Sequence, residues 1–259
     1  MKQVDWKSPA LLAGVERIAR EAAEVVMQVY ATDFKVAGKD DKSPVTEADV
    51  RAEAVILRGL AALAPGVPVV AEESVAAGRV PAIADLFWLV DPLDGTKEFI
   101  SRNGEFTVNI ALVEQGRPVL GVVVAPALAR LYCGVTGVGA WLDDADGRRP
   151  VATRSVPPAG LTVVASRSHG DATALQAFLA GRRVAAQTNA GSSLKLCLVA
   201  AGQADVYPRL GRTMEWDIAA GHGVLAAAGG KVLDLHGQPL RYGKPGFENP
   251  HFAAWGRAE

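Results

Sequence analysis

The chain has 259 residues, of which 49% are hydrophobic and 21% are charged, and its formal net charge is −1. This composition is that of an ordinary globular protein, and the length predicts one compact body with two subdomains. The near-neutral charge, without a long run of one sign, argues against nucleic acid as a partner and against a basic membrane patch. A small anionic substrate needs only local positive charge and stays compatible with it.

The two cysteines, Cys133 and Cys197, lie far apart and outside any C-x-x-C spacing. We expect them to be buried free thiols in a reducing cytoplasm. The first residues lack an apolar signal core, and no stretch approaches the ~18 apolar residues of a membrane span. We therefore expect a soluble cytoplasmic protein without an integral membrane segment.

The first half of the chain predicts paired helices against a largely antiparallel sheet. Ser8 before Pro9 marks a helix start, and apolar residues then recur at helical spacing. Thr46-x-x-Asp49 has the spacing of a capping box at the start of a second helix. Strands are predicted over residues 67–71, 86–90, 106–113, 118–125, 131–135 and 140–142, with a hairpin turn over 114–117.

The second half predicts an α/β layer. A segment rich in charge, glycine and proline over residues 143–158 separates the two parts, and we place the subdomains at 1–150 and 151–259. Beyond it, strands predicted over 161–165, 184–187, 205–207 and 231–235 alternate with helices over 172–179, 192–201 and 216–228. Such alternation favours a sheet covered by helices.

The segment from Trp88 to Thr96, WLVDPLDGT, carries the strongest chemical signal. A buried strand is predicted to deliver Asp91 at its end, and the proline and glycine that follow bend the chain so that Asp94 and the Leu93 carbonyl converge on it. Oxygen ligands of this kind suit Mg²⁺. A turn with solvated aspartates is the structural alternative.

Three further acids have structural explanations when each is taken alone. Glu72 follows a short strand, Asp217 begins a helix, and Asp49 lies in the capping box. Brought together without a cation, the carboxylates of Glu72, Asp91, Asp94 and Asp217 would repel and their pKa values would rise. Two divalent ions roughly 4 Å apart would remove that cost and give a two-metal phosphatase site.

Several motifs together resemble the inositol monophosphatase superfamily of lithium-sensitive, magnesium-dependent phosphatases. They are Asp91-Pro-Leu-Asp94-Gly-Thr96, Trp216-Asp217-x-x-Ala220-Gly221 and Ala228-Gly-Gly230. Within it, the chain is similar to bacterial 3′(2′),5′-bisphosphate nucleotidases in segments 91–100, 103–112, 166–169, 191–195 and 207–211. The similarity runs from about residue 42 to the end, and Lys97-Glu98-Phe99 replaces the Thr-Asn-Phe more usual in inositol phosphatases.

The resemblance implies an α+β fold, the five-layered α/β/α/β/α sandwich of the inositol monophosphatase and sugar phosphatase type. It implies two Mg²⁺ ions, with a third left open, held by Glu72, Asp91, the Leu93 carbonyl, Asp94 and Asp217. The implied catalytic residues are Glu72, Thr96 and Asp49, the last two orienting or deprotonating a water that attacks directly. The Gly95-Thr96 main chain, at a helix start, would help to bind the phosphate.

The resemblance also implies the substrate, adenosine 3′,5′-bisphosphate, hydrolysed to AMP and phosphate in sulfur assimilation, with 3′-phosphoadenylyl sulfate as a second substrate. The second phosphate needs its own cations, for which Lys195, Arg167, Arg209 and Arg212 are candidates. The implied substrate-binding residues are Leu93, Asp94, Gly95, Thr96, Ser166, His169, Gly191, Ser192, Ser193, Lys195, Arg209 and Asp217.

Two alternatives stay open. One is an inositol- or sugar-phosphate phosphatase with the same metals, and the other is a nucleotide-binding regulator that keeps the fold without turnover. A haloacid-dehalogenase-type mechanism is excluded because its two aspartates stand two apart, whereas Asp91 and Asp94 stand three apart. The sequence leaves open a monomer or a homodimer, and a peripheral association with the cytoplasmic face of the inner membrane.

Overall fold

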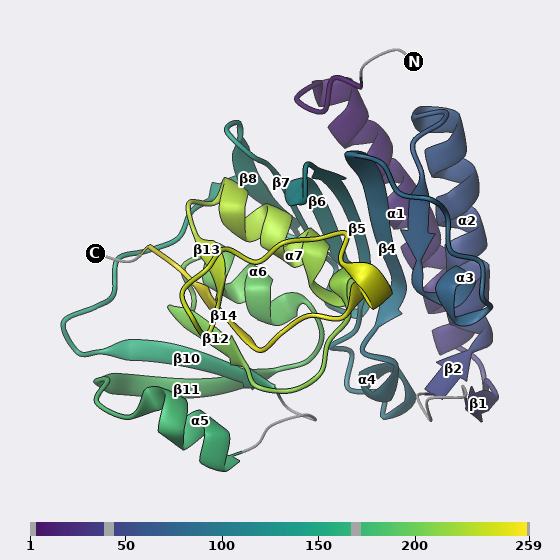
Figure 1. Ribbon diagram of the computed structural model, residues 1–259. Helices are drawn as coiled ribbons and strands as arrows, with labels where there is room; N and C mark the ends of the chain where they lie inside the picture. The colour runs from purple at the N-terminus through teal and green to yellow at the C-terminus, as the bar shows by residue number, and fades with distance from the viewer. Residues whose placement is uncertain (1–3, 39–43, 167–171, 258–259) are drawn as a thin grey trace.

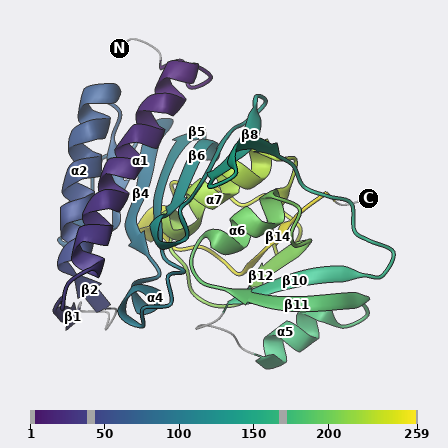
Figure 2. The same cartoon turned by 180° about the vertical axis from the view of Figure 1, so that it is seen from behind.

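The predicted five-layered α+β sandwich is confirmed in a computed structural model, which describes residues 4–38, 44–166 and 172–257 (Figures 1 and 2). Helices α1 (Pro9–Tyr30) and α2 (Glu47–Leu63) form one outer layer. A seven-stranded sheet, helices α6 (Leu194–Ala200) and α7 (Glu215–Ala227), a five-stranded sheet and helix α5 (Ala172–Leu179) follow in that order.

The outer helices begin as the sequence predicts, with one difference in capping. Thr46 caps α2 by accepting a bond from the Ala48 N–H, and Asp49 completes the capping box by accepting the Thr46 N–H. Ser8 occupies the cap position of α1 without a side-chain hydrogen bond, so Pro9 carries that start. Buried aliphatic residues of both helices pack against the large sheet.

The seven-stranded sheet is antiparallel except for its first strand pair. Its order is β3 (Val69–Ala71), β4 (Leu86–Asp94), β5 (Thr107–Glu114), β6 (Arg117–Ala125), β7 (Arg130–Val135), β8 (Gly139–Asp144) and β9 (Gly147–Val151). The predicted hairpin turn is confirmed, since Gln115 and Gly116 both have positive φ, as a two-residue turn requires. Strand β9 was not predicted, because its glycine, proline and charged residues are typical of a linker.

The five-stranded sheet is mixed, with parallel pairing on one side and antiparallel pairing on the other. Its order is β11 (Val184–Ala190), β10 (Leu161–Ser166), β12 (Val206–Arg209), β14 (Phe252–Trp255) and β13 (Lys231–Asp234). Strand β14 was missed in the sequence, because four residues are too few to show an alternating pattern.

Short elements connect the layers, and among them only the helix start at Gly95-Thr96 was expected. They are β1 (Val36–Gly38), β2 (Pro44–Thr46), α3 (Glu72–Ala76), α4 (Thr96–Ile100), η1 (Pro126–Leu128) and η2 (Pro245–Phe247). Two of them, α3 and α4, begin at residues that the sequence assigns to the site.

Glycine allows α7 to lie directly against the large sheet. A Cβ on Gly121 of β6 would stand 2.1 Å from the Ala220 carbonyl oxygen of α7, and one on Gly134 of β7 would stand 2.9 Å from the Val224 Cα. No side chain fits in that space. This close contact fixes the position of α7, and with it Asp217.

The core between the two sheets takes buried side chains from both parts of the chain, so the division at residue 150 stays a prediction. Cys133 and Cys197 are buried and unpaired, as predicted. Among the described residues, no helix has the length and apolar character needed to cross a membrane.

Candidate active site

Four acids from three elements come together where β4, α3 and α7 meet. Asp91 and Asp94 lie at the end of β4, Glu72 begins α3, and Asp217 lies in the first turn of α7. Glu72, Asp94 and Asp217 each repel the carboxylate of Asp91. The structure therefore brings together the four side chains predicted to hold metal.

Strand β4 does not end before Asp91, as the sequence suggested, but continues to Asp94. The pairing with β5 shifts register between Asp91, opposite Asn109, and Asp94, opposite Thr107. A bulge of this kind accommodates Pro92, which has no N–H to donate to the ladder. Because of the bulge, both aspartates reach the site from one strand.

The electrostatics of the acids show uncompensated negative charge. Burial raises the pKa of Asp91 well above its ordinary value, and repulsion by Glu72, Asp94 and Asp217 adds to that rise. The pKa of Asp217 is raised well above its ordinary value by burial and by repulsion from Asp94 and Glu72. A carboxylate that stays ionised in such surroundings needs a cation beside it.

The turn before α6 holds Asp94 in place. The Ser193 N–H donates to Asp94 Oδ2 at 2.6 Å, and the Ser193 hydroxyl donates to the Asp217 carbonyl at 2.7 Å. Burial raises the pKa of Asp94 to about 6, although the nearby Lys195 ammonium and the Ser193 N–H both lower it. One serine thus connects two of the predicted metal ligands.

Gly191 and Ser192 shape this turn. The Gly191 N–H donates to Glu105 Oε2 at 2.8 Å, and a Cβ on Gly191 would stand 2.6 Å from the Glu105 carbonyl. Ser192 has a φ of 44°, which is unusual for a residue other than glycine. Within the predicted segment 191–195, residues 191–193 therefore form a strained turn packed against the loop that follows α4, and α6 begins directly after it.

Lys195 is buried and already partnered by the chain. Its Nζ donates to the Ser192 carbonyl at 2.6 Å and to the Ala190 carbonyl at 3.3 Å, and it lies 5.3 Å from the Tyr207 ring centre. Burial lowers the pKa of Lys195 to about 8. In this arrangement the ammonium holds the turn together and offsets the charge of Asp94.

Arg209, at the end of β12, lies on the same side of the site. Its electrostatic effect lowers the pKa of Asp217 and that of Lys195, so it is close to both. Its Nη2 donates to the Arg212 carbonyl at 2.8 Å, while its buried Nε has no hydrogen-bond partner within the described residues. A buried guanidinium N–H without an acceptor is costly, and an anion would satisfy it.

Thr96 and Asp49 lie at the starts of α4 and α2. The Thr96 hydroxyl donates to the Leu93 carbonyl at 3.3 Å. The buried Asp49 accepts bonds from the Thr46 N–H and hydroxyl, both at 2.8 Å. The pairing of Thr96 with Asp49 stays a prediction.

Two buried glutamates that sequence reasoning missed support these elements. Glu53 accepts bonds in the first turn of α3, and Glu215 accepts the Gly243 N–H at 2.6 Å and the Lys244 ammonium at 2.6 Å. Glu53 follows Asp49 at one helical turn, and Glu215 precedes Asp217 by two. Their nearness to predicted ligands was the available signal.

The remaining predicted residues divide into three cases. Ser166 ends β10 on the side of the five-stranded sheet where Gly191 follows β11, whereas His169 and Arg167 lie outside the described residues. The Arg212 guanidinium pairs with Glu248 at the surface. His222 of α7, which is not among the predicted site residues, bonds to the Tyr242 hydroxyl at 2.8 Å, and burial lowers its pKa to about 3.

The donor set fits Mg²⁺, which prefers carboxylate and carbonyl oxygens. Within the described ranges, however, no three Asp, Glu, His or Cys side chains already stand in the arrangement of a formed metal site. The four acids repel one another through space, and a cation would draw them together. The fit thus rests on their uncompensated charge and oxygen chemistry.

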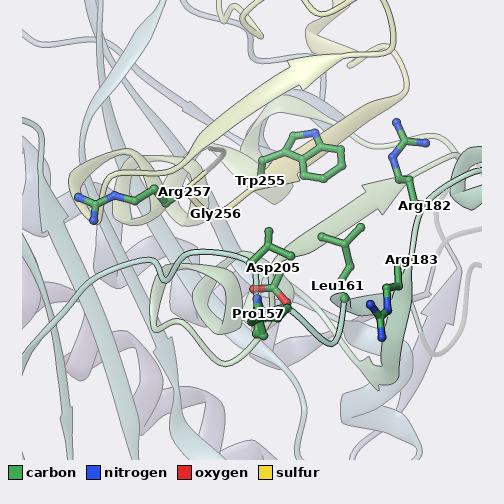
Figure 3. A pocket seen from close by; sticks show the side chains of 11 residues that line it. Pro157, Leu161, Arg182, Arg183, Asp205, Trp255, Gly256 and Arg257 are labelled. Atoms are coloured by element: carbon green, nitrogen blue, oxygen red, sulfur yellow. The ribbon is translucent and has the colours of Figure 1, made fainter.

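A cavity of about 620 Å³ lies elsewhere, at the start of β10 (Figure 3). Leu161 and Asp205 lie beneath the Trp255 ring in this view, and the Arg257 side chain points away. Because Leu161 begins β10 and Ser166 ends it, the cavity and the acids lie at opposite ends of that strand. The cavity takes no part in the site.

The five layers and the four gathered acids define a protein of the phosphatase class that the resemblance implied. The chain matches the inositol monophosphatase family over residues 9–257, and it belongs to that family. Members of the family are metal-dependent phosphatases, with Mg²⁺ as the usual ion.

Two relatives and one further solved structure illustrate the similarity. The 3′(2′),5′-bisphosphate nucleotidase CysQ of Salmonella typhimurium is 49% identical over 245 residues, covering 93% of this chain and 98% of the relative. The crystal structure of CysQ from Bacteroides thetaiotaomicron superposes with a TM-score of 0.80 at 37% identity, covering 96% and 97% of the two chains. The structure of an inositol monophosphatase from Anabaena superposes with a TM-score of 0.73 at 26% sequence identity. The match covers 94% of this chain and 89% of that structure's chain.

Proposed function

We propose that the chain is a Mg²⁺-dependent 3′(2′),5′-bisphosphate nucleotidase that hydrolyses adenosine 3′,5′-bisphosphate to AMP and phosphate. The observation that supports a phosphatase is the cluster of Glu72, Asp91, Asp94 and Asp217, in which burial and then repulsion between the acids raise the pKa values of the three aspartates. The substrate class is supported by relatives of that activity at 49% identity over nearly the whole chain. By the same chemistry, 3′-phosphoadenylyl sulfate is a second substrate.

The residues that would hold the metal come from three elements that the fold fixes independently. Glu72, Asp91 and the Leu93 carbonyl would hold one Mg²⁺, and Asp91, Asp94 and Asp217 a second. The ions would supply a lowered pKa for the attacking water and positive charge for the phosphate oxygens. The reaction needs such electrostatic stabilisation, because phosphate monoesters are among the slowest compounds to hydrolyse without a catalyst.

The chain itself orients the attack. Thr96 stands one residue beyond Gly95, at the start of α4, and its hydroxyl is within reach of the Leu93 carbonyl. With Asp49 it would accept the proton of the water whose oxygen attacks phosphorus. The new P–O bond forms as the bond to the 3′ oxygen breaks. That oxygen leaves with the bonding electron pair and takes a proton from solvent water to become the 3′-hydroxyl of AMP, and no phospho-enzyme is needed.

Positive charge for the second phosphate lies next to the acids. The unsatisfied Nε of Arg209 is the group best placed to bind it, because it is buried and without an acceptor among the described residues. Lys195 would act mainly through the 191–193 turn that it holds. Ser166 and Ser192 would contact the nucleoside side of the substrate.

The test is phosphate release from adenosine 3′,5′-bisphosphate and from inositol 1-phosphate side by side, with Mg²⁺ and with EDTA. We expect Mg²⁺-dependent release that strongly prefers the nucleotide and is inhibited by Li⁺. Preference for inositol 1-phosphate would overturn the substrate and leave the metal chemistry. No release from either compound would contradict the proposed activity.

We place this reaction in the cytoplasm, because its reducing environment keeps thiols such as the two buried free cysteines reduced. A peripheral contact with the inner membrane would involve charged or lipid-binding groups that lie outside the site. Measuring the mass of the protein in solution distinguishes a monomer from a homodimer.

A further inference from the structure

Helix α3 lacks a cap of its own. Its N-cap position is Ala71, which has no side-chain acceptor, and the helix is only five residues long. A single helical turn is not stable by itself, and its first N–H groups need acceptors. Because α3 begins with Glu72, whatever holds this turn also places that carboxylate.

The missing acceptor is supplied by Glu53, from the neighbouring helix α2. Its Oε2 accepts the Glu73 N–H at 2.8 Å, and its Oε1 accepts the Ser74 hydroxyl at 2.6 Å. The Glu73 N–H is the second of the helix, one of the two that an N-cap side chain ordinarily binds. Glu53 therefore performs for α3 the function that Ala71 cannot.

The contact is buried and charge-assisted. Glu53 is 4% exposed and Ser74 is 9% exposed. An ionised carboxylate gains from the positive end of the helix that it caps, and its hydrogen bonds are stronger than those between neutral groups. Arg79 extends the chain of contacts, since its guanidinium donates to the Ser74 hydroxyl at 3.4 Å.

The same helix also carries Asp49. Glu53 follows it by four residues, which puts the two carboxylates on one face of α2. One end of α2 thus carries the residue proposed to take the water's proton and, one turn later, the residue that caps the helix beginning at Glu72. A shift of α3 would move Glu72 relative to Asp49 and Asp91.

We propose that Glu53 is a positioning residue that caps α3 from the neighbouring helix and so places Glu72 for the divalent cation. The proposal rests on the proposed function in one respect, that Glu72 is a metal ligand. Glu53 itself touches neither metal nor substrate. Its removal should therefore change metal affinity more than it changes contact with the nucleotide.

The experiment measures Mg²⁺ affinity of the full chain by titration calorimetry, together with thermal unfolding. We expect Glu53→Ala to weaken Mg²⁺ binding about 10- to 100-fold, the range typical of groups that hold a ligand in place. We expect Ser74→Ala, which loses one bond and should fold, to weaken it about fivefold. Glu53→Gln keeps an acceptor for the Glu73 N–H and should recover part of the loss.

Asp205→Asn is the matched control. Asp205 is also a buried carboxylate, 2% exposed, that accepts a backbone N–H, but it lies at the other end of the five-stranded sheet. We expect it to lower the unfolding temperature and to leave Mg²⁺ affinity unchanged. This separates the placing of Glu72 from a general loss of stability.

Two results would overturn the inference. One is wild-type Mg²⁺ affinity in both Ser74→Ala and Glu53→Ala, and the other is an equal loss of affinity in Asp205→Asn at the same loss of stability. If the unaltered protein fails to bind Mg²⁺, the metal site and the inference fail together. Mg²⁺ binding by the unaltered protein with no effect of these variants refutes the inference alone.

Discussion

Buried aspartates lie in two regions of the structure, at opposite ends of β10, and the chain surrounds them with charges of opposite sign. Asp205 accepts Arg154 Nε at 2.9 Å, Arg154 Nη2 at 3.0 Å and the Thr162 N–H at 2.6 Å. Burial alone would raise its pKa, yet these donors bring it below the ordinary value. Asp91, at the other end, has a pKa raised well above that value by burial and by three neighbouring acids.

The difference separates a structural acid from a functional one. Where the fold needs a buried carboxylate, it supplies a guanidinium and a backbone N–H from its own chain. At the other end it gathers four carboxylates and places Lys195 and Arg209 beside only two of them. The missing positive charge must come from outside the chain.

The largest expected effect belongs to Asp94→Asn. The variant removes a proposed metal ligand while Asn can still accept the Ser193 N–H, so the turn before α6 should persist. Because groups that merely hold a ligand cost about 10- to 100-fold when removed, we expect turnover to fall by more than about 100-fold. Steady-state phosphate release measures it.

The same variant should not destabilise the metal-free protein, since it removes one repelling charge. Thermal unfolding in EDTA is the control for this. Activity within about tenfold of the unaltered enzyme would refute the role of Asp94 as a ligand.

Asp205→Asn should show the opposite pattern. Loss of the charged partner of Arg154 weakens charge-assisted bonds, and we expect the free energy of unfolding to drop by about 2 kcal/mol. The Arg154 side chain is 37% exposed, so water can solvate what remains. Chemical denaturation measures the loss, and a fall in kcat larger than about threefold would contradict the separation of the two regions.

The smallest effect is a dependence of Mg²⁺ stabilisation on pH. Burial raises the pKa of Asp94 to about 6 from 3.8, so the metal-free fold binds an extra proton between these values. Its stability therefore falls as pH rises from about 4 through 6. Mg²⁺ relieves this loss, and we expect it to stabilise the protein by about 1.4 kcal/mol more at pH 8 than at pH 5.

His222 acts in the other direction, because burial lowers its pKa to about 3 from 6.5 and stability then rises with pH in between. His222 changes the stability equally with and without Mg²⁺. The difference between melting curves recorded with and without Mg²⁺ at each pH therefore does not contain its contribution. An Mg²⁺ effect that shrinks from pH 5 to pH 8 would contradict the account.

Local patterns made much of the fold predictable. The capping box of Thr46 and Asp49, the two-residue turn at Gln115 and Gly116, and the period of α1 all depend on neighbours in sequence. The motif from Asp91 to Thr96 was equally visible, because its proline and glycine bend the chain next to both acids. Resemblance then added the layers and Glu72 and Asp217.

The rest depends on contacts between distant segments. Nothing in the sequence around Glu53 shows that it caps α3, and nothing around Glu215 shows that it binds Lys244. The sequence also gave no sign that Lys195 is occupied by carbonyls of its own turn. Such roles require the folded chain, since each joins groups whose order in sequence does not specify their distance.

Crystals soaked in Mn²⁺, which substitutes for Mg²⁺ at oxygen sites and scatters anomalously, would test the central claim most directly. We expect anomalous peaks among the carboxylates of Glu72, Asp91, Asp94 and Asp217, and none beside the Asp205–Arg154 pair. Absence of a peak among those four carboxylates would contradict that claim.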